Sequence, residues 1–214
     1  KDFPGELRYE EICAVMDDLH AFGVRALILS GGEPLLHPRI FDIARRAKAL
    51  GFYVGLSTNG TLINEGNIAS IADCGFDYVG ISLDGLGATH DRFRGQAGAF
   101  AASLEGIRLC RERALKVGIR YTMTQGNAAD LPGLLDLLDT SGVDRFYFSH
   151  LNYAGRGLRN RGEDSHHRMT RAAMERIFEA CLAYVDDSEV SLDALRGRVA
   201  EVWAELDARA KAGR

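Results

Sequence analysis

Residues 27–38, LILSGGEPLLHP, form an apolar run that ends in two glycines, a carboxylate and a proline. Gly31 and Gly32 carry no side chain, so a ligand can approach the backbone N–H and C=O groups at this point. Glu33 adds a negative charge, and Pro34 stiffens the turn. The combination suits a ligand with an ammonium group. The simpler alternative is a tight turn between a strand and a helix, with a solvated acid.

Strand and helix patterns alternate on both sides of this stretch. Short apolar runs predict five strands, at residues 24–30, 52–57, 76–83, 116–123 and 144–150. Apolar residues at helical spacing predict helices at residues 8–22, 38–50, 64–74, 98–115, 130–141, 170–186 and about 191–211. Regular alternation implies a parallel sheet with right-handed crossovers. Five strands are too few for a complete eight-stranded barrel, so we expect an α/β fold built as a partial TIM-type barrel.

The composition excludes several classes of protein. The 214 residues carry a net charge of −4, which offers no basic surface for a nucleic acid. No apolar stretch approaches the roughly 20 residues that cross a bilayer, and no signal peptide is visible. A cytoplasmic protein without nucleic-acid or membrane partners is therefore expected. The chain does not begin with Met, which suggests that its ends are fragment ends.

The four cysteines do not have the spacing of a metal site. They stand at Cys13, Cys74, Cys110 and Cys181, with no CxxC pair among them. Each falls in a segment with a helical pattern. We expect them to be small buried hydrophobic residues, and we assign no metal ligand in this chain.

Chemically versatile residues follow every predicted strand. The strand ends read SGGEP (30–34), STNG (57–60), SLDG (82–85), TMTQGN (122–127) and SHLNYAGRG (149–157), with HDRFRG at 90–95. The carboxyl ends of parallel strands meet at one edge of the sheet, where ligands bind in such folds. Asn-Gly and Asp-Gly are also common turn pairs, and each motif alone is weak. Their accumulation at one edge predicts a polar site.

These motifs together resemble the radical S-adenosylmethionine (SAM) family. The resemblance rests on LSGGEPLL, STNGTLI and GISLDG followed by HDRFR. It implies that the GGEP glycines and acid bind the amino group of SAM, and that an arginine pairs with the SAM carboxylate in two-pronged fashion. The residues that it assigns to the SAM pocket are Gly31, Gly32, Glu33, Ser57, Asn59, Ser82, Asp84 and Arg94, with Thr124 and Gln125 facing the same site.

From about residue 2 to about residue 182 the chain looks like the haem d1 biosynthesis branch of that family. FPGEL (3–7) and FSHLNYAGRGLRNRGEDSHH (148–167) carry this closer resemblance. Members of the branch remove propionate side chains from an iron tetrapyrrole, a decarboxylated sirohaem. The resemblance implies that Arg156, Arg159 and Arg161 meet substrate carboxylates and that His150 and Tyr153 lie against the macrocycle. A solvated loop is the alternative for these arginines.

The chain departs from the family pattern at both ends. The family holds a [4Fe–4S] cluster with a CxxxCxxC loop after the first barrel strand, and this motif is absent here. The expectation is therefore a partial radical SAM core at residues 1–186, without the first strand and the cluster ligands. Residues 187–214 would form an amphipathic helix that stops before any cysteine-rich region. Such a fragment would be inactive alone. Its strand at residues 24–30 would lie at an exposed edge of the sheet. The parent enzyme would need an electron donor.

Three other functions remain open at this point. A radical SAM peptide-modifying enzyme of the PQQ-biosynthesis type shares the GGEP, STNG and SLDG motifs. A SAM-binding module without a cluster would explain the absent CxxxCxxC motif. A metal-dependent barrel hydrolase or aldolase would need a convergent histidine set, and His37, His90 and His150 show no HxH or HExxH spacing.

Overall fold

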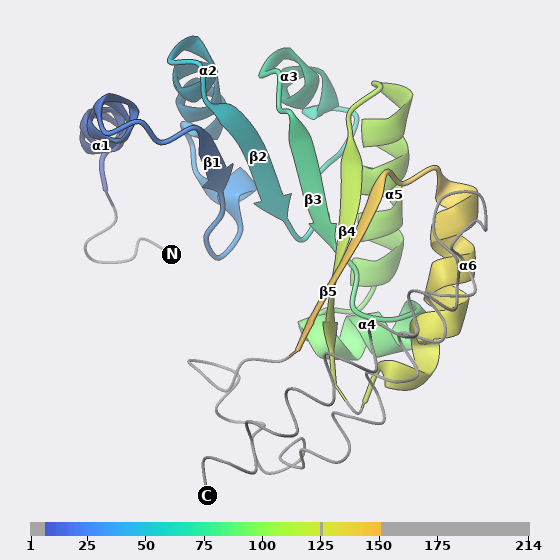
Figure 1. Ribbon diagram of the computed structural model, residues 1–214. Coiled ribbons are helices and arrows are strands. Elements are labelled where there is room, and N and C mark those ends of the chain that lie inside the picture. The colour runs from blue at the N-terminus through green and yellow to red at the C-terminus, as the bar shows by residue number, and fades with distance from the viewer. Residues whose placement is uncertain (1–6, 125, 151–214) are drawn as a thin grey trace, which may run out of the picture. The chain divides into compact units, whose positions relative to one another are not determined.

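The computed structural model describes residues 7–124 and 126–150, whose strands form one parallel sheet in the order β1-β2-β3-β4-β5 (Figure 1). The strands are β1 (Ala26–Leu29), β2 (Tyr53–Thr58), β3 (Tyr78–Ser82), β4 (Val117–Met123) and β5 (Arg145–His150). The predicted α/β fold with five parallel strands is confirmed. The helices expected at 170–186 and 191–211, the domain limit at 186 and Cys181 lie outside the described residues.

Helices connect the strands, as the alternating pattern predicted. They are α1 (Tyr9–Ala21), α2 (Ile40–Ala49), α3 (Ile68–Asp73), α4 (Gly87–Arg94), α5 (Ala99–Glu112) and α6 (Leu131–Ser141), with short 3-10 turns η1 (Pro34–Leu36) and η2 (Ala128–Asp130). Gly23 and Gly51 follow α1 and α2 with φ of +90° and +84°, the left-handed conformation that ends helices and favours glycine. No helix within the described ranges is long and apolar enough to cross a membrane.

Two helices differ from the prediction. The helix expected from residue 64 begins only at Ile68, because two asparagines hold the chain in a turn before it. The Asn64 N–H donates to the Asn67 side chain at 2.9 Å, and the Asn67 amide donates to the Leu62 carbonyl at 2.8 Å. The second difference is α4, which includes most of the HDRFRG stretch, where no helix was predicted. Only His90 of this helix is fully buried, so its sequence lacks the usual apolar stripe.

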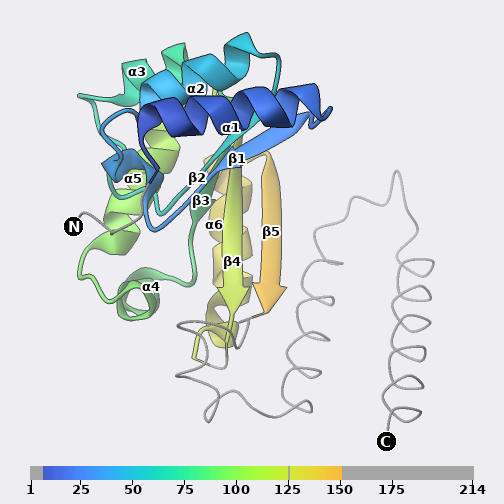
Figure 2. The same ribbon diagram turned by 90° about the vertical axis from the view of Figure 1, so that its left-hand side faces the viewer.

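The hydrophobic core lies between the sheet and the helices on one of its faces. Figure 2 shows α2, α3 and α5 together on that side of the strands. Side chains pointing toward them are fully buried, including Leu56, Ile81 and Ile119. Burying one such side chain stabilises the fold by roughly 1.5–3 kcal/mol. The opposite face, here called the inner face, carries the alternate residues of each strand, which are more polar and more exposed.

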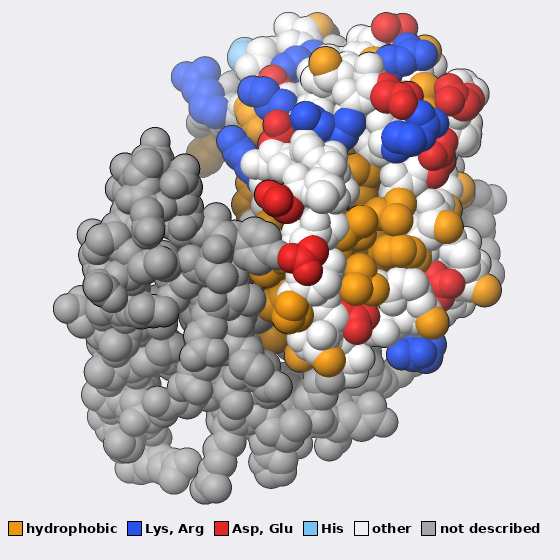
Figure 3. Space-filling view, turned by 90° about the vertical axis from the view of Figure 1, so that its right-hand side faces the viewer, with side chains coloured by type: hydrophobic (Ala, Val, Ile, Leu, Met, Phe, Trp, Pro, Cys, Tyr) orange, Lys and Arg blue, Asp and Glu red, His pale blue; other side chains and the backbone are white. Residues whose placement is uncertain are grey.

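The outer surfaces carry charges of both signs. Figure 3 shows positive and negative side chains intermixed around a group of hydrophobic ones. On α5, Arg108 pairs with Glu105 at 2.6 Å, and such exposed pairs contribute little to stability. At the edge of the sheet, β1 pairs only with β2 among the described strands, and Ile28 is 48% exposed. The expectation of an edge strand at 24–30 is thus confirmed within this part of the chain.

The cysteines are only partly as expected. Cys74 and Cys110 are buried, and burial raises the pKa of the Cys110 thiol to about 12. Cys13 is half-buried, so the prediction of a fully buried side chain was wrong there. It lies on α1, where Met16 is the only buried residue, because this helix packs beside the edge of the sheet.

Candidate functional site

The GGEP turn lies directly after β1 and is fixed by its own acid. The Glu33 carboxylate accepts hydrogen bonds from the Thr58 hydroxyl at 2.7 Å, the Asn59 N–H at 2.8 Å and the Leu35 N–H at 3.2 Å. It therefore caps η1 and ties the turn to the end of β2. A carboxylate has about four acceptor positions, so three are used and about one remains for a ligand.

The two glycines of this turn are exposed. A Cβ atom placed at Gly31 or Gly32 would meet nothing within 4 Å. Their backbone groups are therefore accessible from solvent. The space around Gly32 would therefore accept an alanine side chain.

The STNG turn after β2 uses most of its polar groups internally. The Asn59 side-chain oxygen accepts from the Thr61 N–H and hydroxyl, both at 2.8 Å. Its backbone carbonyl accepts from the Ser103 hydroxyl at 2.8 Å. Ser57, in contrast, points to the inner face, where its hydroxyl accepts from Arg120 at 2.5 Å. Ser57 and Asn59 are thus close in sequence but directed differently.

A buried network joins the ends of β3 and β4 to α4. The Asp84 side chain is fully buried, accepts from the Thr122 N–H at 2.7 Å and forms an ion pair with Arg94. The Asn127 amide donates to the backbone carbonyl of Asp84 at 2.9 Å. Burial raises the pKa of the Asp84 carboxyl, and the positive charge of Arg94 opposes that shift.

His90 belongs to the same network. Its Nδ1 accepts from the Asp84 N–H at 2.9 Å. Burial, assisted by the nearby charge of Arg94, lowers the pKa of His90 to about 4. The imidazole is therefore neutral near pH 7, with its proton on Nε2. His90 thus contacts the backbone of Asp84, whose carboxylate pairs with the Arg94 guanidinium.

Arg94 keeps part of its surface free. Its side chain is 28% exposed although one guanidinium nitrogen is paired with Asp84. The structure thus brings together two pairs of the predicted SAM residues, Glu33 with Asn59 and Asp84 with Arg94. Ser82 lies separately, on the inner face at the end of β3.

The predicted substrate residues fall largely beyond this part of the structure. His150 is the last residue of β5. Tyr153, Arg156, Arg159 and Arg161 lie outside the described residues, as does Gln125. Thr124 was also expected to face the site. Its N–H donates to the Asn127 side-chain oxygen at 2.7 Å, and its hydroxyl donates to the same oxygen at 3.1 Å.

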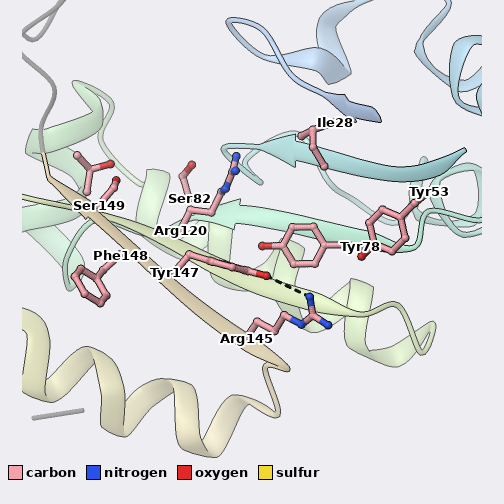
Figure 4. Close-up of a pocket in the computed structure, with 10 residues that line it drawn as sticks. Ile28, Tyr53, Tyr78, Ser82, Arg120, Arg145, Tyr147, Phe148 and Ser149 are labelled. Carbon is pink, nitrogen blue, oxygen red and sulfur yellow. Dashed lines mark hydrogen bonds between the residues drawn. The ribbon is translucent and has the colours of Figure 1, made fainter. Parts of the chain in front are cut away.

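A cavity of about 650 Å³ occupies the inner face of the sheet (Figure 4). Sequence inspection missed most of its residues, because they lie within strands and not at strand ends. Their signal is the two-residue period of β4 and β5, which places Arg120 beside Thr122 and Arg145 beside Tyr147 on one face. The cavity is lined by Ile28, Tyr53, Tyr78, Ser82, Arg120, Thr122, Arg145, Tyr147, Phe148 and Ser149.

The described residues do not fit an iron–sulfur cluster. Over residues 7–124 and 126–150, no three His, Cys, Asp or Glu side chains come close enough to hold a metal ion. Cys13, Cys74 and Cys110 belong to different helical segments. Any cluster would therefore need ligands from elsewhere in the protein.

The fold and the polar strand ends define a core of the radical SAM type, and comparison with known proteins agrees. The model of the Radical SAM superfamily matches residues 1–138, and the chain belongs to this superfamily. Members use SAM and a [4Fe–4S] cluster. The crystal structure of Streptococcus suis SuiB bound to S-adenosylmethionine has the same fold, with a TM-score of 0.62 at 17% identity over 82% of this chain and 43% of that chain.

Curated relatives are more similar in sequence. Pre-heme d1 synthase of Dinoroseobacter shibae is 49% identical over 92% of this chain and 48% of its own length. Fe-coproporphyrin III synthase of Methanosarcina barkeri is 41% identical over 83% of this chain and 45% of its length. PqqA peptide cyclase of Rhodopseudomonas palustris is 31% identical over 91% of this chain and 48% of its own length. The chain thus spans about half the length of the curated relatives that it matches.

Proposed function

We propose that the protein to which this chain belongs is a radical SAM enzyme of haem d1 biosynthesis. Its substrate would be an iron tetrapyrrole, a decarboxylated sirohaem, from which it removes propionate side chains. The observation that carries the proposal is the 49% identity to a pre-heme d1 synthase across nearly the whole chain. The haem-related relative from Methanosarcina barkeri supports the substrate class. The electron donor and a cytoplasmic location stay predictions.

The SAM site would lie along the carboxyl edge of the sheet. Glu33 has about one acceptor position left for the methionine ammonium group, and the backbone at Gly31 and Gly32 is accessible beside it. The exposed part of Arg94 would pair with the methionine carboxylate. Ser57, Asn59, Ser82 and Asp84 would complete the pocket, with Asp84 acting through the position of Arg94.

The [4Fe–4S] cluster would be held by cysteines outside this chain. When SAM and the cluster are bound, they supply the 5′-deoxyadenosyl radical that abstracts hydrogen in this family. The described residues would orient SAM, and they hold no cluster ligand set. We therefore propose that this chain is inactive when it is produced alone.

Two rivals make different predictions. A peptide-modifying enzyme related to the PqqA peptide cyclase would bind a leader peptide and would not bind tetrapyrroles. The 31% identity to that cyclase supports this rival less than the 49% identity supports the haem d1 assignment. A cluster-less SAM-binding module would show no CxxxCxxC motif in the coding sequence upstream of Lys1. Reading that sequence in frame separates this rival from an enzyme.

The test of the SAM site uses the protein extended upstream to include its cluster segment, reconstituted with iron and sulfide. Formation of 5′-deoxyadenosine is measured at varied SAM concentration. We expect Glu33→Gln to raise the KM for SAM at least about tenfold, because a charge-assisted hydrogen bond is lost. Glu65→Gln, at a residue whose side chain is 75% exposed, is the matched control. An unchanged KM in Glu33→Gln would refute the assigned site.

A further inference from the structure

The described residues that line the inner-face cavity include two arginines and no acid. Arg120 lies on β4 and Arg145 on the neighbouring β5, and both line the cavity. Their polar contacts are to neutral groups, since Arg120 donates to the Ser57 hydroxyl at 2.5 Å and Arg145 to the Tyr147 hydroxyl at 3.3 Å. Among the described residues, no carboxylate lines the cavity and no salt bridge involves either arginine. The two guanidinium groups can therefore accept an anionic ligand.

Tyr78 adds an unpaired donor between them. Its side chain is 9% exposed, and its hydroxyl has no hydrogen-bond partner among the residues that the structure describes. Figure 4 shows the hydroxyl directed into the group formed by Arg120, Tyr147 and Arg145. Burial is the main cause that raises the pKa of Tyr78 to about 12, so the phenol keeps its proton. A buried donor without a partner is costly unless a ligand supplies the acceptor.

Glycines on the sheet hold this tyrosine in place. A Cβ atom at Gly118 would lie 2.5 Å from the Tyr78 hydroxyl, and one at Gly80 would lie 2.9 Å from its ring. The ring therefore rests across the backbone of β3 and β4, where larger residues would clash. The ring of Tyr147 meets it edge to face, with centroids 5.9 Å apart. The donor is thus preorganised by packing.

The spacing of the two arginines suits a ligand with several carboxylates. Gly118 is the register partner of Arg145, so Arg120 lies one strand across and two residues further along. With about 3.3 Å per residue and 4.8 Å between strands, the two Cα atoms are roughly 8 Å apart. Tyr53 and Tyr147, which are 42% and 44% exposed, offer aromatic surface beside them. Flat aromatic rings bind to such surface.

We propose that Arg120, Arg145 and the Tyr78 hydroxyl form the subsite that binds the carboxylates of a flat aromatic polycarboxylate. Given the proposed function, on which this inference rests, that ligand is the tetrapyrrole substrate, and the two arginines pair with two of its acidic side chains. The cavity volume of about 650 Å³ lies within the 300–1,000 Å³ range of small-molecule sites. These residues are separate from Arg94 of α4, the residue proposed to pair with the SAM carboxylate.

The test measures binding to the full chain of iron(III) coproporphyrin III, which has free carboxylates, and of its tetramethyl ester, whose side chains carry no charge. Absorbance of the macrocycle is titrated for the wild type, Arg120→Gln, Arg145→Gln and Tyr78→Phe. We expect each arginine variant to bind the acid about tenfold more weakly and the ester unchanged. Tyr78→Phe should lose a smaller factor. Arg113→Gln, at an exposed position after α5, is the matched control, and circular dichroism verifies folding.

The possible outcomes separate this inference from the proposed function. If the wild type binds the acid and both arginine variants bind it equally well, the subsite is wrong and the substrate class stands. Equal affinity of the wild type for acid and ester would also overturn the subsite. If the wild type binds neither compound, the tetrapyrrole function falls, and the inference with it. None of these outcomes bears on the assignment of the SAM site, because the 5′-deoxyadenosine assay tests that assignment separately.

Discussion

His90 should make the fold sensitive to mild acid. Its folded-state pKa is about 4, below the unfolded value of 6.5, because burial and Arg94 disfavour the imidazolium. As the pH falls below 6.5, His90 becomes protonated in the unfolded chain but stays neutral in the folded protein, so the free energy of unfolding decreases. Between pH 7 and pH 5 this linkage amounts to about 2 kcal/mol, and changing the folded pKa by one unit alters that figure little.

Urea unfolding followed by circular dichroism, at pH 7 and at pH 5, measures this loss. The wild type is compared with His90→Gln, which cannot take up a proton in this range. Asp84 beside it has a raised pKa and acts with the opposite sign, since the folded state then binds its proton more readily. That contribution is largely shared by both proteins. We therefore take the difference between the two pH dependences as the measured quantity.

We expect the wild type to lose about 2 kcal/mol more than His90→Gln between pH 7 and pH 5. His20→Gln, at an exposed histidine on α1, serves as the control and should behave like the wild type. Equal pH dependence in the wild type and His90→Gln would refute the reasoning, because it would mean that the folded protein accepts the proton on His90.

Further predictions concern packing and thiol reactivity. Gly106→Ala should lower the free energy of unfolding by about 1–3 kcal/mol in urea titrations, since its Cβ would lie 2.7 Å from the Gly60 carbonyl oxygen. Gly32→Ala should change it by less than about 0.5 kcal/mol, as no atom lies within 4 Å, and a larger loss would contradict the structure. Ellman's reagent at pH 8, read by peptide mapping, should label half-buried Cys13 well before buried Cys110; comparable rates would show that α5 does not protect its thiol.

The fold was largely predictable because burial imposes a clear pattern on this chain. Strands such as β3 and β4 are buried on the side of the helices and read as apolar runs. Positive φ at Gly23 and Gly51 marks helix ends that any local inspection would find. The start of α3 was not predictable in the same way, since side-chain hydrogen bonds of Asn64 and Asn67 hold the turn.

The candidate site was predictable where it depends on strand ends and not where it depends on side-chain direction. The polar edge followed from motif positions alone. Glu33 accepts three hydrogen bonds from its own protein, and Asp84 pairs with Arg94. Both observations depend on distances in the folded chain that the local sequence does not reveal. The inner-face arginines were missed because Arg120 and Arg145 resemble ordinary surface charges until the register of β4 and β5 is known.

The most direct test of the proposed function is turnover of a tetrapyrrole. The protein extended to include its cluster segment is reconstituted and incubated with decarboxylated sirohaem, SAM and a reductant. Mass spectrometry then follows the macrocycle and 5′-deoxyadenosine together. We predict 5′-deoxyadenosine formation that depends on the tetrapyrrole, with products that have lost propionate side chains. An unchanged macrocycle, with SAM cleavage stimulated instead by a PqqA-type peptide, would contradict the haem d1 assignment and favour a peptide-modifying enzyme.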